Sequence, residues 1–548
     1  MNDARIPAPL APDFDTVIVG AGFAGLYMLH KLRETGFTTC VFEAGTGVGG
    51  TWYWNRYPGA RCDIESVDYS YSFSPELEQE WQWSERYPRQ PEILAYLNHV
   101  ADRFDLRRDI ALETRVTAAH FDERAGLWRI ETDRGQHVTA RYCVMATGCL
   151  SLPKQPDFPG VERFAGDWYL TAGWPREPVD LTGKRVGVIG TGSTAIQVIP
   201  QVAREAAHLT VFQRTANFSV PARNGPLPAA EQQRVKADYQ TRRGISRDSL
   251  FGVPVPMPAA PRRTRDIPPA ELHQTLETLW AQGGAMSLLA AAPDVIADPE
   301  ANAIVAEFVR EKIRATVKDP KVAALLCPST HPLGTKRLCL DTDYYETYNR
   351  GNVTLVDLRA EPIEQITEHG LRTSTTEYPL DVLIFATGFD AMTGALNGID
   401  IRGRDGLALK QAWAQGPQTY LGLASAGFPN MFLITGPQSP SVFSNMVVSI
   451  EQHVEWIADC MAYLRAHDVA RIEASPQAQA GWVAHVAQVA NGTLLPQTDS
   501  WYVGANVPGK PRVFTPYLGG VGPYRQHCEQ VAARGYEGFE LIRRPVAA

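Results

Sequence analysis

Two glycine-rich turns are the residues of this sequence whose types and spacing point most directly to chemistry. The first, GAGFAG at residues 20–25, lies between an apolar run and a helical pattern, and Glu43 ends the next apolar run. In such a turn Gly20 permits a sharp bend, Gly22 lets a pyrophosphate approach the backbone, and Gly25 lets helix and strand pack closely. A carboxylate at the position of Glu43 accepts hydrogen bonds from ribose hydroxyls. This segment therefore predicts a dinucleotide-binding site.

The second turn, GTGSTA at residues 190–195, repeats the pattern with two informative changes, the first being Ala195 in place of the third glycine, which still permits close packing. Gly190 and Gly192 take the places of the first two glycines, and Ser193 opens the helix that follows. The next strand ends in VFQR, so Arg214 follows where the first copy has an acid. A carboxylate would repel a ribose 2′-phosphate, whereas a guanidinium can hold it with two hydrogen bonds. We therefore predict FAD at the first turn and NADPH at the second.

A third motif follows Glu43, in the segment GVGGTWYWNRYPGARCDIES. It contains Gly50, Trp52 and Asp63 at the spacing of the fingerprint [A/G]GxWxxxx[F/Y]P[G/M]xxxD. With these residues the chain resembles the type I Baeyer–Villiger monooxygenases, because every defined position of their long fingerprint is matched. Later segments such as HPLGTKRLCLDTDYYETYN and WYVGANVPGKPRVF are similar to the same family. The resemblance covers essentially the whole chain and is closest to the phenylacetone and steroid monooxygenase branch.

The resemblance implies an activity and assigns roles to individual residues. A member of this family converts ketones to esters or lactones with NADPH and O2, through a C4a-peroxyflavin. By resemblance, Arg337 stabilises the anions that form on this path, and Asp63 orients Arg337 and balances its charge. Arginine suits this role because its guanidinium keeps its proton. Lys336 would help Arg214 and Thr215 to hold the 2′-phosphate, and Gly50 and Trp52 would contact FAD.

The substrate is less clear from the sequence than the cofactors. The loop at residues 436–446 resembles the segment that lines the active site in the phenylacetone branch, and a second such segment contains Trp501. An apolar wall would include an adaptable methionine. Arylketones, medium-ring ketones and larger terpenoid or steroidal ketones are all compatible with these residues. The predicted substrate pocket consists of Ser441, Val442, Phe443, Met446 and Trp501.

One family motif is altered, and it leaves alternatives open. The linker fingerprint FxGxxxHxxxW[P/D] is matched at residues 164–175 except that Leu170 replaces the histidine. Leucine can neither hydrogen-bond nor change its charge near neutral pH. The alternatives are a largely uncoupled NADPH oxidase, in which peroxide is released, and an N- or S-oxygenating flavin monooxygenase. A disulfide reductase is disfavoured because the eight cysteines include no CxxC pair.

The elements that must position these residues form two βαβ units. Strand, glycine turn, helix and strand follow one another around each turn, which predicts an α/β protein with two Rossmann-like dinucleotide-binding domains. Apolar runs that end at Gly148 and Gly388 mark the points where the chain leaves one domain for the other. We predict an FAD domain from residues 12–150 and 385–540, an NADP domain from 151–222 and 336–384, and a helical insertion at 223–335.

Composition adds only broad limits. The chain of 548 residues has 52 Lys and Arg against 60 Asp and Glu, a formal net charge of −8. Such a chain has no electrostatic footprint for nucleic acid. No apolar stretch approaches the length of a membrane span, and the first residues do not resemble a signal peptide. Scattered cysteines favour neither a metal site nor disulfides. We expect a cytoplasmic protein, monomeric, with a small ketone and O2 as partners.

Overall fold

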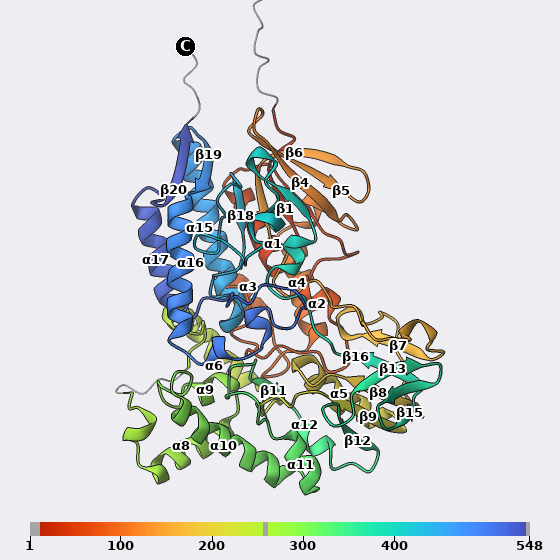
Figure 1. Ribbon diagram of the computed structural model, residues 1–548. Helices are drawn as coiled ribbons and strands as arrows, with labels where there is room; N and C mark the ends of the chain where they lie inside the picture. The colour runs from red at the N-terminus through yellow and green to blue at the C-terminus, as the bar shows by residue number, and fades with distance from the viewer. Residues whose placement is uncertain (1–10, 256–260, 544–548) are drawn as a thin grey trace, which may run out of the picture.

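The computed structural model describes residues 11–255 and 261–543, and its largest sheet contains the first glycine turn (Figure 1). The strands lie in the order β17-β4-β5-β6-β1-β2-β3, with β18 also paired to β6. The strands from β6 through β1 and β2 to β3 are parallel, whereas β4, β5 and β6 pair in antiparallel fashion. Their bounds are β1 Phe14–Val19, β2 Thr39–Phe42, β3 Ile110–Ala111, β4 Val116–Asp122, β5 Leu127–Thr132, β6 His137–Met145, β17 Asp400–Arg402 and β18 Met431–Leu433.

The second sheet is parallel throughout and contains the second glycine turn. Its five strands lie in the order β12-β9-β8-β16-β7. Parallel strands covered on both faces are expected to be apolar along their whole length, as in β16, which is buried at all four residues. The bounds are β7 Asp167–Leu170, β8 Arg185–Ile189, β9 His208–Gln213, β12 Val353–Asp357 and β16 Val382–Phe385.

Each glycine turn connects a central strand to the helix that packs on it. Helix α1 (Phe23–Glu34) follows β1, and α5 (Ser193–Glu205) follows β8. Leu26, Leu29 and Leu32 of α1 are fully buried, which gives this helix the apolar face that its sequence pattern predicts. The two βαβ units predicted from the sequence are therefore present, and the predicted α/β fold with two Rossmann-like sheets is confirmed.

The chain passes between the two sheets twice, after β6 and after β16. Strand β7 already belongs to the second sheet, and β17 and β18 return to the first. The linkers lie side by side, because Pro153 and Phe389 form a bridge and Lys154 N donates to Gly388 O at 3.0 Å. This topology supports two discontinuous domains. The bounds 12–150 with 385–540, 151–222 with 336–384, and 223–335 remain our proposal for the division.

Helices fill most of the region predicted as an insertion, and in Figure 1 they form the green part at the lower edge. The insertion also includes residues 256–260, which lie outside the described part of the chain. The rest is helical because Ala, Leu, Glu and Gln favour helices. The helices are α6 Ala229–Ala237, α7 Tyr239–Asp248, α8 Pro269–Gln282, α9 Ala285–Leu289, α10 Pro299–Thr316 and α11 Pro320–Leu326.

Three long helices near the C-terminus pack beside α1 and the first sheet (Figure 1). They are α15 Met446–Ala466, α16 Pro476–Asn491 and α17 Val521–Ala533. Among the described residues, no helix has both the length and the apolar character that a membrane crossing would require. The remaining elements are α2 Thr51–Trp54, α3 Pro75–Glu80, α4 Gln90–Arg103, α12 Tyr344–Thr347, α13 Gly394–Asn397, α14 Leu409–Ala412, β10 Ser219–Pro221, β11 Cys339–Asp341, β13 Ile363–Thr367, β14 Gly370–Thr373, β15 Glu377–Pro379, β19 Val469–Ala474 and β20 Phe539–Arg543.

Candidate active site

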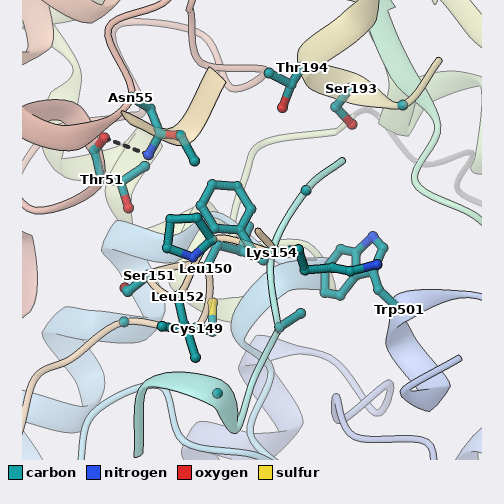
Figure 2. Close-up of a pocket in the computed structure, with 18 of the residues that line it drawn as sticks. Thr51, Asn55, Cys149, Leu150, Ser151, Leu152, Lys154, Ser193, Thr194 and Trp501 are labelled. Carbon is teal, nitrogen blue, oxygen red and sulfur yellow. Dashed lines mark hydrogen bonds between the residues drawn. The ribbon is translucent and has the colours of Figure 1, made fainter. Parts of the chain in front are cut away.

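A single large cavity of about 1880 Å³ lies between the two sheets and contains both glycine turns in its lining. In Figure 2, Ser193 and Thr194 of α5 lie on one side of it, and Thr51 of α2 and Asn55, the residue after α2, lie across from them. The carboxyl ends of parallel strands are where α/β folds bind their ligands. The position of the cavity therefore agrees with the two dinucleotide sites predicted from the sequence.

The first turn has the close packing that its glycines predict. Gly20 has φ +106°, and a Cβ on Gly25 would lie only 1.8 Å from the Gly20 carbonyl oxygen. Glu43 is buried, and its carboxylate accepts hydrogen bonds from Ala21 N at 2.8 Å and Gly45 N at 2.7 Å. Glu43 thus holds the turn to the next loop. It also lines the cavity, where the oxygens keep capacity to accept bonds from ribose hydroxyls.

The long fingerprint brings Gly50 and Trp52 to the same place. A Cβ on Gly50 would lie 2.9 Å from Gly22 Cα, so the two glycine segments are in direct contact. Trp52 lies in the cavity wall, and its indole Nε1 donates to the Tyr69 hydroxyl at 3.2 Å. Because neither Gly22 nor Gly50 carries a side chain, a pyrophosphate can approach the backbone in this part of the cavity.

The second turn is built in the same way at the edge of the second sheet. Gly190 has φ +117°, and a Cβ there would lie 2.6 Å from Ala386 O. No heavy atom lies within 4 Å of a Cβ built on Gly192, so this side of the turn is open to a ligand. Ser193, Arg214 and Thr215 all line the cavity, as the sequence predicts.

Cations gather beyond the second turn. Arg214, Lys336 and Arg359 all line the cavity, and Arg359 Nε donates to Arg214 O at 3.0 Å. Burial and the neighbouring Arg214 lower the pKa of Lys336, and burial together with Lys336 lowers the pKa of His331 to about 4. Positive charges held this close to one another favour a bound anion. The group fits the 2′-phosphate predicted for NADPH.

Sequence reasoning missed Arg359, although the topology explains its position. Strand β12 pairs with β9 in parallel, with Asp357 opposite Gln213. Residues that follow neighbouring parallel strands meet at the same edge of the sheet, so Arg359 lies beside Arg214. In the sequence, Arg359 follows the end of β12 by two residues. This spacing indicates a site residue only once the order of the strands is known.

Arg337 and Asp63 meet in the cavity wall although 274 positions separate them. Arg337 Nε and Nη2 donate to Asp63 Oδ2 at 3.0 and 2.5 Å, and Nη1 donates to Val442 O at 2.5 Å. Burial would lower the pKa of Arg337, but the Asp63 carboxylate outweighs it and raises that pKa above its ordinary value. The guanidinium is therefore a cation of fixed charge and fixed direction.

The predicted substrate residues divide into two groups. Val442, Met446 and Trp501 line the cavity. Ser441 is fully buried and donates to Ser439 O, and Phe443 packs on Tyr502 with ring centroids 4.4 Å apart. Neither is part of the cavity lining, so their roles as substrate contacts remain predictions.

Tyr502 is a further neighbour of Arg337 that the sequence did not single out. Its side chain is buried; burial raises the pKa of its hydroxyl, and the nearby Arg337 guanidinium opposes this. Trp501 belongs to a segment that resembles the family, and Tyr502 is the next residue of the same segment. Its ring packs on those of Phe443 and Trp501, with centroids 4.4 and 4.2 Å away.

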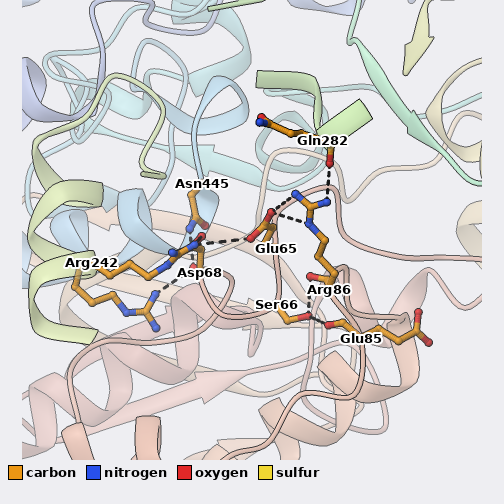
Figure 3. A network of polar contacts seen from close by, with 9 residues as sticks. Glu65, Ser66, Asp68, Glu85, Arg86, Arg242, Gln282 and Asn445 are labelled. Atoms are coloured by element: carbon orange, nitrogen blue, oxygen red, sulfur yellow. Dashed lines mark hydrogen bonds and ion pairs between the residues drawn. The ribbon is translucent and has the colours of Figure 1, made fainter. Parts of the chain in front are cut away.

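A buried polar network holds the Met446 end of the site to the insertion (Figure 3). Arg242 of α7 donates to both carboxylate oxygens of Asp68, each at 2.6 Å. The backbone oxygen of Asp68 accepts from Asn445 Nδ2 at 2.7 Å, and Asn445 Oδ1 caps α15 by accepting from Val447 N. Because Met446 is the first residue of α15, this network sets the position of the apolar wall.

We expect Arg242→Met to destabilise the protein and to raise the KM for ketone. The Asp68 carboxylate, only 4% exposed, would lose its partner, and breaking such a buried pair costs about 3 kcal/mol. Thermal unfolding and ketone titration measure both effects. Arg262→Met is the control, since its pair with Glu271 is half exposed and contributes at most about 1 kcal/mol. An Arg242→Met enzyme with parental unfolding and parental KM would contradict the role of this network.

Leu170 lies at the end of β7, beside Phe385 in the register of the second sheet. Its side chain is half-buried against an apolar cluster that includes Phe164 and Ile189, and it also lines the cavity. The leucine thus extends the core of the NADP domain to the cavity surface. Nothing in this packing distorts the linker, since the adjoining Thr171 hydroxyl donates to Phe385 O.

The residues present fit the two predicted cofactors. On the FAD side, Gly22 and Gly50 pack against each other and present backbone alone to the cavity. On the NADPH side, Asn217 Oδ1 and Ser500 Oγ are buried without a hydrogen-bond partner, and both residues line the cavity. Unpaired polar atoms are costly to bury, so they favour a polar ligand at this position.

Known proteins resemble this chain along nearly its whole length. The family described as pyridine nucleotide-disulphide oxidoreductase matches residues 17–242. A Baeyer-Villiger monooxygenase of Pseudooceanicola batsensis is 44% identical over 534 residues, which cover 97% of this chain and 96% of that protein. A phenazine N-monooxygenase of Lysobacter antibioticus is 42% identical over 535 residues, 97% of this chain and 98% of the relative.

A solved structure has the same fold at higher identity. It is described as an oxidized steroid monooxygenase bound to NADP, and it is 53% identical to this chain. The TM-score is 0.93, and the match covers 97% of this chain and all of the other. At this similarity the two chains share their domain arrangement as well as the topology of each sheet.

Proposed function

The chain belongs to the Baeyer–Villiger monooxygenase family, and from that premise we propose that Arg337, held by Asp63, is the residue through which it converts ketones to esters. The protein is an FAD- and NADPH-dependent enzyme that oxygenates ketones. Bound NADPH supplies the hydride, and bound FAD supplies the redox and oxygen chemistry. The observation that carries the proposed role is a guanidinium fixed in the cavity wall by a carboxylate and a backbone oxygen.

The charge of Arg337 matches what ketone oxygenation requires. Attack on a carbonyl carbon places negative charge on the carbonyl oxygen, and a preorganised cation stabilises that charge most strongly where water is excluded. Its side chain is 20% exposed, on the cavity side, so the guanidinium can reach a substrate oxygen without leaving Asp63. Asp63 is then a positioning residue that keeps the fork of Arg337 directed at the substrate.

The apolar wall supports a ketone of predominantly hydrocarbon character. Val442 and Met446 lie on one side, and Leu150 and Trp501 line the same cavity. Figure 2 shows Leu150 and Trp501 around the open space. An apolar pocket binds the hydrocarbon part of a substrate, while Arg337 provides the polar group that orients its carbonyl. We propose an arylketone, medium-ring ketone or larger terpenoid or steroidal ketone as the substrate.

NADPH recognition should depend on the cation group. We expect Arg214→Ala and Arg359→Ala each to raise the KM for NADPH by about 10- to 100-fold, since a bond to a charged group contributes about 1.5–3 kcal/mol. The kcat should change little, because the 2′-phosphate is remote from the reaction and binds equally throughout. Steady-state kinetics with NADPH and NADH measure this. Arg350→Ala, an exposed arginine of the same domain outside the cavity lining, is the control. Equal losses with NADPH and NADH would contradict the assignment.

N-oxygenation is a second candidate because a relative with that printed name is 42% identical. Oxygen transfer to an amine nitrogen leaves no carbonyl oxyanion, so it gives Arg337 no comparable charge to stabilise. An aromatic amine or phenazine that yields an N-oxide in Arg337→Ala as fast as in the parent would identify this activity. The Arg337–Asp63 pair favours the ketone reaction.

The direct test uses purified enzyme with NADPH, air and a ketone panel. Phenylacetone, cyclohexanone, a long-chain 2-ketone and progesterone span the pocket sizes that the apolar wall allows. We expect at least one of them to give ester in proportion to the NADPH consumed, with ester and hydrogen peroxide quantified together. NADPH consumption with peroxide as the sole product across the whole panel would count against the proposed ketone activity and favour an uncoupled oxidase.

Location and assembly remain proposals. All eight cysteines are free, which suits the reducing cytoplasm that we propose as the site of action. We propose a monomer, because both nucleotide turns and the Arg337–Asp63 pair lie within one chain. Sedimentation of the FAD-loaded protein measures the assembly state.

A further inference from the structure

The loop that carries the long fingerprint lies directly against the NADPH-binding helix α5. Gln197 of this helix makes three hydrogen bonds to it. The Tyr57 hydroxyl donates to Gln197 Oε1 at 2.7 Å, Arg61 N donates to the same oxygen at 3.3 Å, and Gln197 Nε2 donates to Arg61 O at 3.1 Å. One side chain of the NADP domain therefore pairs with both backbone groups of a residue in the FAD domain.

The approach at this contact is unusually close. Gly59 has φ +86°, and a Cβ there would lie 2.4 Å from the backbone oxygen of Gln197. A residue with a side chain would push the loop away from α5, so glycine is required for this contact. The loop and the helix are thus fitted to each other at the backbone, in addition to the three hydrogen bonds.

Gln197 joins the two halves of the site by a short covalent path on each side. It lies one helical turn after Ser193, which opens α5 at the NADPH turn, and both residues line the cavity. Arg61 lies two residues before Asp63, which orients Arg337. A shift of α5 on nucleotide binding would therefore reach Asp63 through one side chain and two peptide units.

The other side of the loop is held within its own domain. The Arg61 guanidinium pairs with Glu85 at 3.4 Å, and Gln90 N donates to Ala60 O at 2.9 Å. Without Gln197 the loop would keep these contacts and remain folded on the FAD domain. The contribution of Gln197 is therefore to hold the loop against α5. Its loss should change the position of the loop relative to α5 more than the fold of the loop itself.

We propose that Gln197 is a positioning residue that transmits the seating of NADP(H) on α5 to the Asp63–Arg337 pair. This inference rests on the proposed role of that pair. It assigns to one side chain the coupling between nucleotide binding and oxygen transfer to the substrate. It also gives the NADP domain a way to keep Asp63 in position after hydride transfer.

The test compares Gln197→Ala with Glu205→Ala, a change at the exposed last residue of the same helix, outside the cavity lining. Hydrogen–deuterium exchange of the peptide spanning residues 57–64 is measured with and without NADP⁺ on the FAD-loaded proteins. We expect NADP⁺ to slow exchange in the parent and in Glu205→Ala, and to have little effect in Gln197→Ala. Equal protection by NADP⁺ in Gln197→Ala and the parent would overturn the proposal.

The coupling of NADPH consumption to ester formation gives a second readout. We expect ester formed per NADPH to fall by about 3- to 10-fold in Gln197→Ala, the scale of one or two hydrogen bonds, with peroxide making up the difference. Flavin reduction at saturating NADPH should stay within about 2-fold of the parent, because Ser193 and the cation group are intact. A parental ester yield would overturn the proposal.

Tyr57→Phe provides a variant that keeps the ring and removes one of the three bonds. It should lose part of the NADP⁺ protection, and full protection in both variants would refute the assignment to Gln197. The parent enzyme, measured in the same assays, distinguishes a failure of the proposed function from a failure of the role of Gln197. If the parent makes no ester from any ketone, the proposed function fails, whereas the exchange experiment still decides whether Gln197 transmits nucleotide binding.

Discussion

Arg337→Ala will lose ester formation while NADPH continues to reduce the flavin. Removing one preorganised group that stabilises developing negative charge costs about 10²–10³-fold in rate, and Arg337 is the cation that Asp63 holds in the cavity wall. Flavin reduction depends on nucleotide seating at the second turn and the cation group, which the substitution leaves in place. Anaerobic stopped-flow reduction and aerobic product analysis measure the two halves separately.

Two variants sharpen this result. Arg337→Lys keeps the charge but cannot donate at once to Asp63 and to Val442 O with a planar fork, so it should recover only a small part of the rate. Arg350→Ala removes an exposed arginine of the same domain and should leave both reactions unchanged. Ester formation by Arg337→Ala at near the parental rate would show that another group stabilises the oxyanion.

Gly25→Ala will give a protein without bound flavin and with much lower thermal stability. Its Cβ would lie 1.8 Å from the Gly20 carbonyl oxygen, and both atoms belong to backbone that cannot move aside without opening the turn. Overpacking costs about 1–3 kcal/mol and more where backbone must shift. At about 2–4 °C per kcal/mol, the melting temperature should fall by about 2–12 °C or more. The flavin absorbance of the purified protein reports the loss of FAD.

The matched control is Gly481→Ala in the interior of α16. No heavy atom lies within 4 Å of the Cβ it would add, so this change should leave the flavin bound. Alanine is favoured over glycine inside a helix by about 1 kcal/mol, so stability should stay equal or rise slightly. A yellow, fully stable Gly25→Ala protein would show that the first turn is looser than its geometry indicates.

The sequence predicted the two turns well because their requirements are local. Glycines at fixed spacing between a strand and a helix are constrained by backbone geometry alone. The structure adds the steric reason for a difference between the copies that the pattern already contained. Ala195 is tolerated where the second helix begins, whereas Gly25 at the matching position has no room for a methyl group. The first helix therefore packs closer to its strand than the second.

Contacts between distant segments were harder to predict. The pairing of Asp63 with Arg337 came from resemblance, since 274 positions separate the two residues and no local rule joins them. Arg359 and Gln197 were missed because their positions depend on strand order and on how the two domains meet. Both are ordinary polar residues in the sequence, and only the assembled sheets place them at the cavity.

The sequence also could not predict which apolar residues of the substrate loop face the cavity. Apolar residues in a loop can face a cavity or the core, and period alone does not distinguish these positions. Val442 and Met446 face the cavity, whereas Phe443 packs on Tyr502. The packing of Leu170 explains why a leucine is stable at this position. The effect of Leu170 on the coupling of NADPH consumption to ester formation is measured by the yield of hydrogen peroxide.

Labelling with ¹⁸O₂ tests the central claim most directly. The purified enzyme is given NADPH, ¹⁸O₂ and the best ketone of the panel, and the ester is analysed by mass spectrometry with its NADPH cost. We predict one ¹⁸O atom per ester, in the single-bonded oxygen between the carbonyl carbon and the migrated group, for each NADPH consumed. Label in peroxide alone, or an oxygenated product whose ketone carbonyl survives, would contradict the assignment of Arg337 and Asp63 to ketone oxygenation.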